Sequence, residues 1–304
     1  MTAPDAAASV GVDVSVVIVT YNSRDVVGRC IESIRQQTRG VAYEIIVVDN
    51  ASPDDTGLYV KEHYPDVTVL HMQTNIGLSA AINDGVAAST GAYVMQLNPD
   101  CRLDGDVLAA LSSFLRDHPD AGVAAPKLLN DDGSLQLSCR AFPGYSTALF
   151  SRYSLLTKLW PGNPVSKRYL MTGFDHTQQH DVDWASGAAL MFPRAVFDRL
   201  SGWDPGFFLF SEDVDFCKRV HNARVHDANL RVVYLPEARV YHTIGISERP
   251  TTRAIIERHR SMYRYYRKHL RRTVLQDLIT APIIILRCAF ALMRRMLSPQ
   301  RRRG

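Results

Sequence analysis

The chain has 304 residues, of which 46% are hydrophobic and 22% are charged. This composition excludes a disordered or fibrous protein, and it fits one large α/β domain or two smaller ones. The five cysteines are scattered without the spacing of a metal site, which suits a reducing compartment. Residues 1–12 lack the basic start and apolar core of a secretion signal, so we expect a flexible lead-in there.

Strands and helices are predicted to alternate through the first hundred residues. Apolar runs rich in β-branched residues predict buried strands at 14–20, 43–48, 67–72 and 93–97. Helices are expected at 24–37, 54–64 and 79–89. This pattern predicts a parallel sheet with helices on both faces.

One edge of this sheet is the predicted ligand site. Tyr21, Asp49, Asn75 and Asp100 all follow strands, and the carboxyl ends of parallel strands form the edge where ligands bind. The chain lacks both the glycine-rich loop of dinucleotide binders and a Walker motif. A nucleotide bound here should therefore be held by its base and by a metal ion on its phosphates.

Asp100 follows the strand at 93–97 through Asn98 and Pro99. Pro99 cannot donate a ladder hydrogen bond and disfavours a helical Asn98, so the strand should end there. A carboxylate at this edge suits a hard divalent cation such as Mg²⁺ or Mn²⁺. The alternative is that Asp100 only caps a helix beginning near Asp104.

The second half contains a long irregular stretch and an acidic cluster. A helix at 104–118 and a strand at 122–127 are followed by irregular residues 128–180, which are interpreted as a mobile lid or substrate loop. Glu212, Asp213 and Asp215 follow an aromatic run at a helix start that Ser211 is expected to cap. Acidic residues are common at helix starts, but burial beside aromatic rings would raise a carboxyl pKa toward that of a working base.

Taken together, these motifs resemble glycosyltransferase family 2, the inverting enzymes of the GT-A fold, and specifically a bacterial rhamnosyltransferase-like branch. The motifs are Thr20-Tyr21-Asn22, Val48-Asp49-Asn50-Ala51-Ser52, Asn75-Ile76-Gly77, Leu97-Asn98-Pro99-Asp100, Trp184-Ala185-Ser186-Gly187-Ala188 and Glu212-Asp213-Val214-Asp215. The resemblance covers about residues 14–242. It implies a Rossmann-like, mostly parallel α/β sheet with a nucleotide-sugar-binding half (13–127), an acceptor-binding half (128–250) and a basic helical tail (251–304).

The resemblance also implies roles for single residues. The nucleotide-sugar would be bound by Thr20, Tyr21, Asn22, Asp49, Ser52, Asn75, Gly77, Asn83 and Asn98. The acceptor would be bound by Trp184, Gly187, Glu212 and Asp215, although Trp184 can equally be a buried structural residue. Asp100 and His242 would hold Mg²⁺ or Mn²⁺, and Asp213 would be the catalytic base.

Two features depart from the family pattern. Asn98 replaces the first aspartate of the metal motif, so metal binding would depend on Asp100 with His242. The segment between Cys217 and Arg231 is longer than the usual turn, so the helix that carries Asp213 should be extended or interrupted there.

The resemblance implies transfer of a sugar from a nucleotide-sugar, first of all dTDP-rhamnose, with inversion at the anomeric carbon. The acceptor would be a glycan or a polyprenyl-diphosphate-linked saccharide in cell-envelope polysaccharide synthesis. A UDP-hexose donor and a catalytically inactive nucleotide-sugar-binding membrane scaffold are the alternatives. A nucleotidyltransferase would need a glycine-rich basic loop after the first strand, and Tyr21-Asn22-Ser23-Arg24 stands there instead.

The tail is strongly basic. Residues 252–304 carry fourteen Lys or Arg against Glu257 and Asp277, although the whole chain has a net charge of only +4. Such a segment favours an anionic partner. Nucleic acid is not expected, because no recognition fold accompanies the charge. Arg264, Arg267 and Lys268 are candidates to hold the acceptor diphosphate.

The end of the tail is predicted to lie on a membrane. Residues 275–297 are apolar but interrupted by Pro282 and Arg287, so they fall short of a spanning helix. One side of the helix carries a polar stripe of Gln276, Thr280, Arg287, Arg294 and Ser298. This pattern, with the arginines at 301–303, predicts a helix in the interface of an anionic membrane and a peripheral enzyme on the cytoplasmic face of the plasma membrane. A helix-packing or oligomer contact is the alternative.

Overall fold

The computed structural model describes residues 11–145, 147, 160, 163–171, 173–225, 228–243 and 251–297. Most of the expected lead-in and the arginines at 301–303 lie outside these residues. The strands are β1 (Val14–Thr20), β2 (Tyr43–Asp49), β3 (Thr68–His71), β4 (Tyr93–Leu97), β5 (Cys101–Asp104), β6 (Ala121–Leu129), β7 (Cys139–Arg140), β8 (His180–Val182), β9 (Trp184–Ala185), β10 (Ala189–Pro193), β11 (Arg224–Val225), β12 (Ala228–Asn229) and β13 (Arg231–His242).

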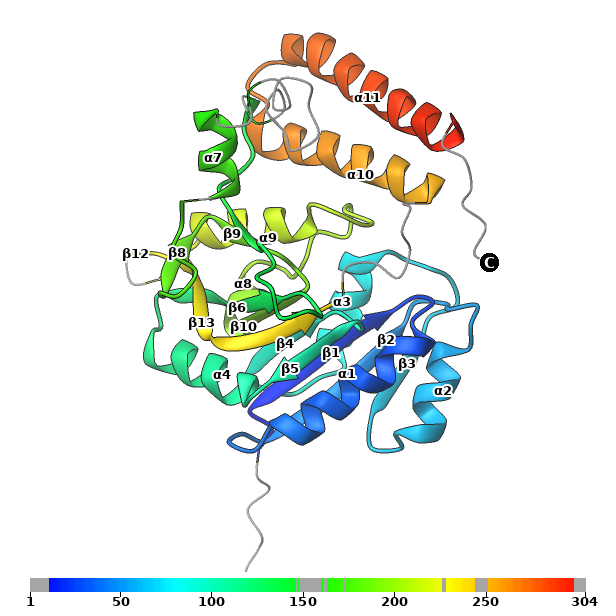
Figure 1. Cartoon of the computed structure of the whole chain (residues 1–304), viewed down its shortest axis with the longest axis vertical. Coiled ribbons are helices and arrows are strands. Elements are labelled where there is room, and N and C mark those ends of the chain that lie inside the picture. Colours follow the sequence, from blue (N-terminus) through cyan, green and yellow to red (C-terminus); the bar gives the residue numbers. More distant parts are fainter. Residues whose placement is uncertain are drawn as a thin grey trace, which may run out of the picture.

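The helices surround these strands (Figure 1). They are α1 (Arg24–Gln37), α2 (Thr56–His63), α3 (Leu78–Ala87), α4 (Val107–Asp117), α7 (Pro164–Leu170), α8 (Arg194–Arg199), α9 (Glu212–Asn222), α10 (Thr252–Tyr265) and α11 (Asp277–Leu297). A π-helical turn (Tyr266–Leu270) extends α10, and a 3₁₀ turn (Val274–Gln276) leads into α11.

A mixed sheet of nine strands forms the centre of the described part of the chain. Its order is β3-β2-β1-β4-β10-β6-β13-β5, with β8 paired to β13. The strands β3, β2, β1 and β4 are parallel, as the sequence predicts. β10 is antiparallel to β4 and joins this half to the second one.

Alternating side chains of the buried strands supply two separate cores. In β1, Val16 and Ile18 pack with residues of α1 and α4 on one face of the sheet. Val17 packs on the opposite face with residues of α3, α8 and α9. A strand buried on both faces needs an almost continuous apolar run, which is why the first strand is recognisable in the sequence.

The expected helix at 104–118 begins later than predicted, at Val107. Residues Cys101–Asp104 instead form β5, which pairs antiparallel with the end of β13. Asp106 caps the helix by accepting a hydrogen bond from the Ala109 amide. Asp100 therefore does not cap a helix, and it lies in the short link between β4 and β5.

Three further expectations have different outcomes. Ser211 occupies the N-cap position of α9, but its side chain makes no capping hydrogen bond. The long segment after Cys217 is explained by an interruption, because α9 ends at Asn222 and the hairpin β11–β12 follows. Residues 128–180 include β7 and α7, so this stretch is not wholly irregular, and of the expected lid, residues 146, 148–159, 161, 162 and 172 lie outside the described ranges.

The tail forms two packed helices above the α9 side of the sheet (Figure 1). The segment Val274–Leu297 is long and apolar enough to cross a membrane by length and composition. This corrects the expectation that Pro282 and Arg287 make the segment too short and polar to span. Residues 274–297 are also mostly exposed, since only Ile284 among them is fully buried.

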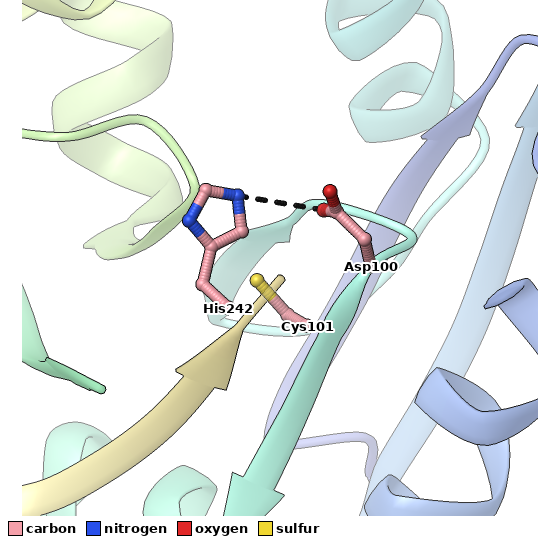
Figure 2. Close-up of side chains that lie close together, drawn as sticks. All are labelled: Asp100, Cys101 and His242. Atoms are coloured by element: carbon pink, nitrogen blue, oxygen red, sulfur yellow. Dashed lines mark ion pairs between the residues drawn. The ribbon is translucent and has the colours of Figure 1, made fainter. Parts of the chain in front are cut away.

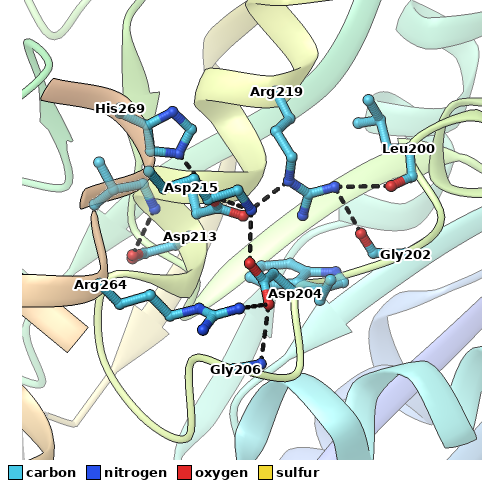
Figure 3. A network of polar contacts seen from close by, with 12 residues as sticks. Leu200, Gly202, Asp204, Gly206, Asp213, Asp215, Arg219, Arg264 and His269 are labelled. Atoms are coloured by element: carbon cyan, nitrogen blue, oxygen red, sulfur yellow. Dashed lines mark hydrogen bonds and ion pairs between the residues drawn. The ribbon is translucent and has the colours of Figure 1, made fainter. Parts of the chain in front are cut away.

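A network of ion pairs fastens the tail to α9 (Figure 3). Lys268 contacts Asp204 at 2.6 Å and Asp215 at 2.8 Å, so one ammonium bridges two carboxylates. Arg264 donates to Asp204 at 2.7 Å, and His269 contacts Asp215 at 2.7 Å. The tail is therefore part of the folded unit.

Asp204 is the more accessible carboxylate of this network and allows a test of it. Burial raises the pKa of Asp204, but hydrogen bonds from Lys268 and Arg264 outweigh burial and lower that pKa to about 2. A lowered folded-state pKa stabilises the protein fully above the unfolded value near 4, and this stabilisation is lost as the pH falls toward 2.

We expect Asp204→Asn to lower the free energy of unfolding at pH 7 by about 2 kcal/mol, since the lowered pKa corresponds to that much stabilisation. The difference from the wild type should shrink below pH 4. Urea denaturation followed by circular dichroism measures both quantities, with exposed Asp117→Asn as the matched control. An equal stability of Asp204→Asn and wild type at pH 7 would contradict the role of the network.

Candidate active site

The carboxyl ends of β1 and β2 place several expected nucleotide-sugar residues together. Thr20 lies opposite Asp49 in the sheet, and its hydroxyl donates to Asp49 Oδ1 at 3.1 Å. Asp49 is buried, whereas Tyr21 is exposed at the same edge. The amide of Asn22 donates to the Ser52 hydroxyl at 3.2 Å, which joins the two loops that leave these strands.

Asn50, which lies in one of the expected nucleotide-binding motifs, organises the neighbouring loop. Its Nδ2 donates to Asn75 Oδ1 and to the Gly77 carbonyl, both at 3.2 Å, and its Oδ1 accepts from the Ile76 amide. Gly77 has a φ of +89°, and a Cβ there would lie 2.9 Å from the Phe208 Cα. Glycine is therefore required where this loop crosses the 206–210 segment.

The side chain of Asn83 is used within the fold and does not face a ligand site. Its Oδ1 accepts from the Trp203 amide and its Nδ2 donates to the Trp203 carbonyl, both at 2.8 Å. Both ends of the side chain are thus used to hold the loop after α8. Asn98 remains at the edge of the sheet, where its Oδ1 accepts from Gln96 at 3.3 Å.

Asp100 and His242 meet at the ends of β4 and β13, as Figure 2 shows. His242 Nε2 lies 3.5 Å from Asp100 Oδ1, and potential ligand atoms of Asp100, Cys101 and His242 lie within 4.8 Å of one another. Burial raises the pKa of the Cys101 thiol well above its usual range. The carboxylate and the imidazole therefore form the donor pair that suits Mg²⁺ or Mn²⁺.

Gln136 fixes the orientation of the His242 ring. Gln136 Nε2 donates to Asn130 Oδ1 and to the His242 carbonyl, so its Oε1 is left to accept from His242 Nδ1 at 2.7 Å. A proton on Nδ1 leaves the lone pair of Nε2 directed toward Asp100, which is the tautomer a metal site needs. The sequence alone gave no signal for Gln136.

Asp213 lies in the first turn of α9 and is held by two backbone amides. Its Oδ2 accepts from Gly187 at 3.0 Å and its Oδ1 accepts from Val214 at 2.8 Å. Burial raises the pKa of Asp213, and these two hydrogen bonds oppose that increase. They also direct the carboxylate toward the segment between β9 and β10.

Glu212 differs from its neighbour. Its side chain is buried, and its Oε2 has no hydrogen-bond partner among the described residues. Burial, followed by the charge of Asp213, raises the pKa of Glu212 well above its usual range. Burial thus raises the pKa of both carboxyl groups, and Asp213 differs in accepting two backbone hydrogen bonds that stabilise its charged form.

The remaining expected acceptor residues are packed inside the protein. Asp215 is fully buried and contacts Arg219, Lys268 and His269, so its oxygens hold the tail in place. The indole N–H of Trp184 donates to the Ala141 carbonyl at 2.9 Å, and only 9% of this residue is exposed. Of the expected acceptor residues, Gly187 lies beside the sheet edge that carries Asp100, since the next residue, Ala188, accepts a hydrogen bond from the Asn98 amide.

The tail cations expected to hold a diphosphate are also engaged. Arg264 and Lys268 pair with Asp204 and Asp215, as described above. The Arg267 guanidinium carbon lies 5.9 Å from the Tyr263 ring centre. Arg264 and Lys268 thus serve the packing of the tail.

The sequence profile of glycosyl transferase family 2 matches residues 15–179, more than half of the chain. The chain belongs to glycosyltransferase family 2. It is 29% identical over 238 residues to N-acetylglucosaminyl-diphospho-decaprenol L-rhamnosyltransferase from Mycobacterium tuberculosis, a match that covers 75% of each chain. It is 25% identical over 225 residues to the low-salt glycan biosynthesis hexosyltransferase Agl10 from Haloferax volcanii, covering 73% of this chain and 66% of that protein.

Solved structures agree with this assignment at the level of the fold. Mannosyltransferase PcManGT from Pyrobaculum calidifontis, in complex with GDP-Man and Mn²⁺, superposes with a TM-score of 0.56 at 18% identity, covering 96% of this chain and 79% of that one. GalNAc-T7 with UDP, GalNAc and Mn²⁺ gives a TM-score of 0.57 at 19% identity. The match covers 79% of this glycosyltransferase but only 45% of the GalNAc-T7 chain. The fold is GT-A, as expected.

We expect His242→Ala to weaken Mn²⁺ binding strongly, because it removes one of the two candidate ligands. Gln136→Ala should weaken it by about 10-fold to 100-fold through the loss of ring orientation, the usual effect of removing such a supporting group. Isothermal titration with MnCl₂ measures both, and the exposed His63→Ala is the control. Unchanged Mn²⁺ affinity in His242→Ala would exclude this site.

Proposed function

We propose that this glycosyltransferase moves rhamnose from dTDP-rhamnose to a polyprenyl-diphosphate-linked N-acetylglucosamine, with inversion. The mycobacterial rhamnosyltransferase, aligned over 75% of both chains, supports this choice of donor and acceptor. A UDP-hexose donor is the second candidate, since the chain also resembles the hexosyltransferase Agl10. The observation that carries the chemical proposal is the position of Asp213 across the Gly187–Ala188 link from the edge of the sheet that carries Asp100.

The Gly187–Ala188 link contacts both sides of the proposed site. The amide of Gly187 donates to Asp213, and the carbonyl of Ala188 accepts from the Asn98 amide at 2.8 Å. Asn98 and Asp100 belong to the same short link after β4. A donor diphosphate near Asp100 and an acceptor hydroxyl near Asp213 can therefore approach each other at this edge.

In the proposed reaction, Asp213 accepts the proton of the acceptor hydroxyl while that oxygen attacks the anomeric carbon of the donor. The bond between the anomeric carbon and the phosphate oxygen breaks on the opposite face, and the diphosphate leaves with the electron pair. A divalent cation at Asp100 and His242 would supply charge neutralisation at that diphosphate. One displacement inverts the anomeric configuration, and a positioned base typically contributes about 10²–10⁴-fold.

The exposed side of α11 supports membrane binding. Leu278, Ile279 and Leu286 are about 70% exposed, whereas Ile284 is buried. Thr280 and Arg287 are spaced to share the side of Ile284 and are half-buried. This part of the expected polar stripe therefore faces the packed side, and the apolar side is free to enter lipid.

The arrangement of the tail favours a helix that lies in the membrane interface. α11 packs along α10, and the π turn after α10 is fastened to α9 by Lys268 and His269 (Figure 1). A helix held along α10 can bury its other, apolar face in lipid without crossing the bilayer. We propose a peripheral enzyme on the cytoplasmic leaflet, where a lipid-linked acceptor is within reach.

We expect Asp213→Asn to lower kcat for rhamnose transfer by at least about 10²-fold, because the amide cannot accept the proton. The affinity for the nucleotide-sugar should stay unchanged. Glu212→Gln is the matched control and should retain most of the activity, since an amide imitates a neutral carboxyl group. Steady-state kinetics with the proposed donor and acceptor measure the activity of both variants. Full turnover by Asp213→Asn would refute the role of this base.

We also expect replacement of Ile279 and Leu286 by Gln to release the protein from liposomes that contain anionic lipid, because the change removes apolar area from the exposed side of α11. Cosedimentation measures the bound fraction. The control is Leu58→Gln, which changes an exposed residue of α2. Undiminished sedimentation of the double variant would mean that α11 does not mediate membrane binding.

A further inference from the structure

Arg140 is a half-buried cation with no ionic partner in the part of the chain that the structure describes. Within those residues its guanidinium makes neither a hydrogen bond nor an ion pair, whereas Arg219, Arg231 and Arg264 each contact a carboxylate. The Arg140 guanidinium carbon lies 5.8 Å from the ring centre of Trp184. A guanidinium held against an aromatic ring keeps its N–H donors available for an anion.

The position of Arg140 relative to Asp213 follows from strand pairing. Arg140 in β7 lies opposite Trp184 in β9, and three residues later the same chain reaches Gly187, whose amide binds Asp213. The next residue, Ala188, contacts Asn98 at the donor side. Along residues 184–188, the chain first passes Arg140, then the Asp213 carboxylate, and then the link between β4 and β5 that carries Asp100. Arg140 is thus on the acceptor side of the base.

The charge of Arg140 affects the pKa of Asp213. Burial raises the pKa of Asp213, and the nearby Arg140 acts in the opposite direction. The two side chains form no direct ion pair among the contacts of the described residues. Arg140 is therefore close enough to lower the pKa of Asp213, but its guanidinium is not used in an ion pair with that carboxylate.

A hollow begins at the residue after Arg140. Its volume is about 360 Å³, and α7 provides one of its walls. The walls include the apolar residues Phe142, Pro164 and Val165 together with Arg168 and Asp183, whose Oδ2 accepts from the Phe142 amide at 2.7 Å. The apolar walls suit a hydrocarbon chain, and Arg140 beside the hollow, which has no ionic partner among the described residues, suits the anionic group at the head of that chain.

The hollow also lies beside the π turn that connects α10 to α11. The Tyr145 hydroxyl donates to the Leu270 carbonyl at 3.2 Å, and the Tyr145 ring lies 6.0 Å from that of Tyr266. Leu270 ends the π turn, and α11 with its exposed apolar side follows. In Figure 1, α7, α9, α10 and α11 lie on the same side of the sheet. A path thus leads from Asp213 past Arg140 and the hollow to α11.

We propose that Arg140 binds the diphosphate of the lipid-linked acceptor and that the hydrocarbon chain leaves over the hollow toward α11. This assignment rests on the proposed function. The acceptor hydroxyl and the diphosphate belong to one sugar residue, so the base and the cation must lie close together on the acceptor side, as they do. Arg140 orients the acceptor and takes no part in bond making or breaking.

The test compares two acceptors with the same sugar, one linked to a short-chain prenyl diphosphate and one as an uncharged octyl glycoside. We expect Arg140→Gln to lower kcat/KM for the diphosphate acceptor by about 10-fold to 100-fold, the usual effect of losing a charge-assisted hydrogen bond. KM for the donor should not change, and turnover of the octyl glycoside should fall far less than that of the diphosphate acceptor, since loss of the Arg140 charge acts on Asp213 with either acceptor. Arg140→Lys should restore part of the loss, and the exposed Arg116→Gln is the control.

Equal losses with both acceptors, or no loss with the diphosphate acceptor, would overturn the role of Arg140. An unchanged melting temperature of Arg140→Gln shows that any loss is not due to misfolding. The wild-type rates test the proposed function separately. If the wild type transfers no sugar to the diphosphate acceptor, the proposed function fails, and the assignment of Arg140 fails with it.

Discussion

The link between Gly187 and Ala188 is the contact on which the active site depends. Gly187 holds the Asp213 carboxylate through its amide, while the Ala188 carbonyl accepts hydrogen bonds from the Asn98 amide and the Cys101 thiol. Three segments distant in the sequence therefore meet at two consecutive residues. A Cβ at Gly187 would lie 3.2 Å from the Asp213 Cβ, so even a methyl group would press on the base. The spacing between the proposed base and the donor side is fixed here.

The tail shows that charge counts do not identify a partner by themselves. Its basic residues suggest an anionic ligand, yet Arg264, Lys268 and His269 are used internally against Asp204 and Asp215. Because these contacts face inward, the tail is held on α9 while the apolar side of α11 remains exposed. Arg140, which belongs to the catalytic domain and lowers the pKa of Asp213, has no ionic partner among the described residues. Electrostatics thus fasten the tail, and apolar area remains for membrane contact.

The sequence predicts much of the fold because doubly buried strands leave a clear pattern. β1, β2 and β4 are apolar runs that end in turn-forming residues, and their parallel pairing follows from the helices between them. β5 was missed because it has only four residues and depends for pairing on β13, more than 120 residues later. The pairing of Asp100 with His242 was accessible from the family resemblance. The internal roles of Asn83 and Asp215 were not, because they depend on contacts with Trp203 and the tail.

The proposed reaction needs a donor diphosphate and an acceptor alcohol held on either side of the Gly187–Ala188 link. A crystal structure with Mn²⁺, a nucleoside diphosphate and the lipid-linked acceptor analogue tests this most directly, because anomalous scattering locates the metal independently. We expect the anomalous peak between Asp100 and His242, with the acceptor hydroxyl within hydrogen-bond distance of Asp213. A metal bound elsewhere, or an acceptor hydroxyl directed away from Asp213, would contradict the account.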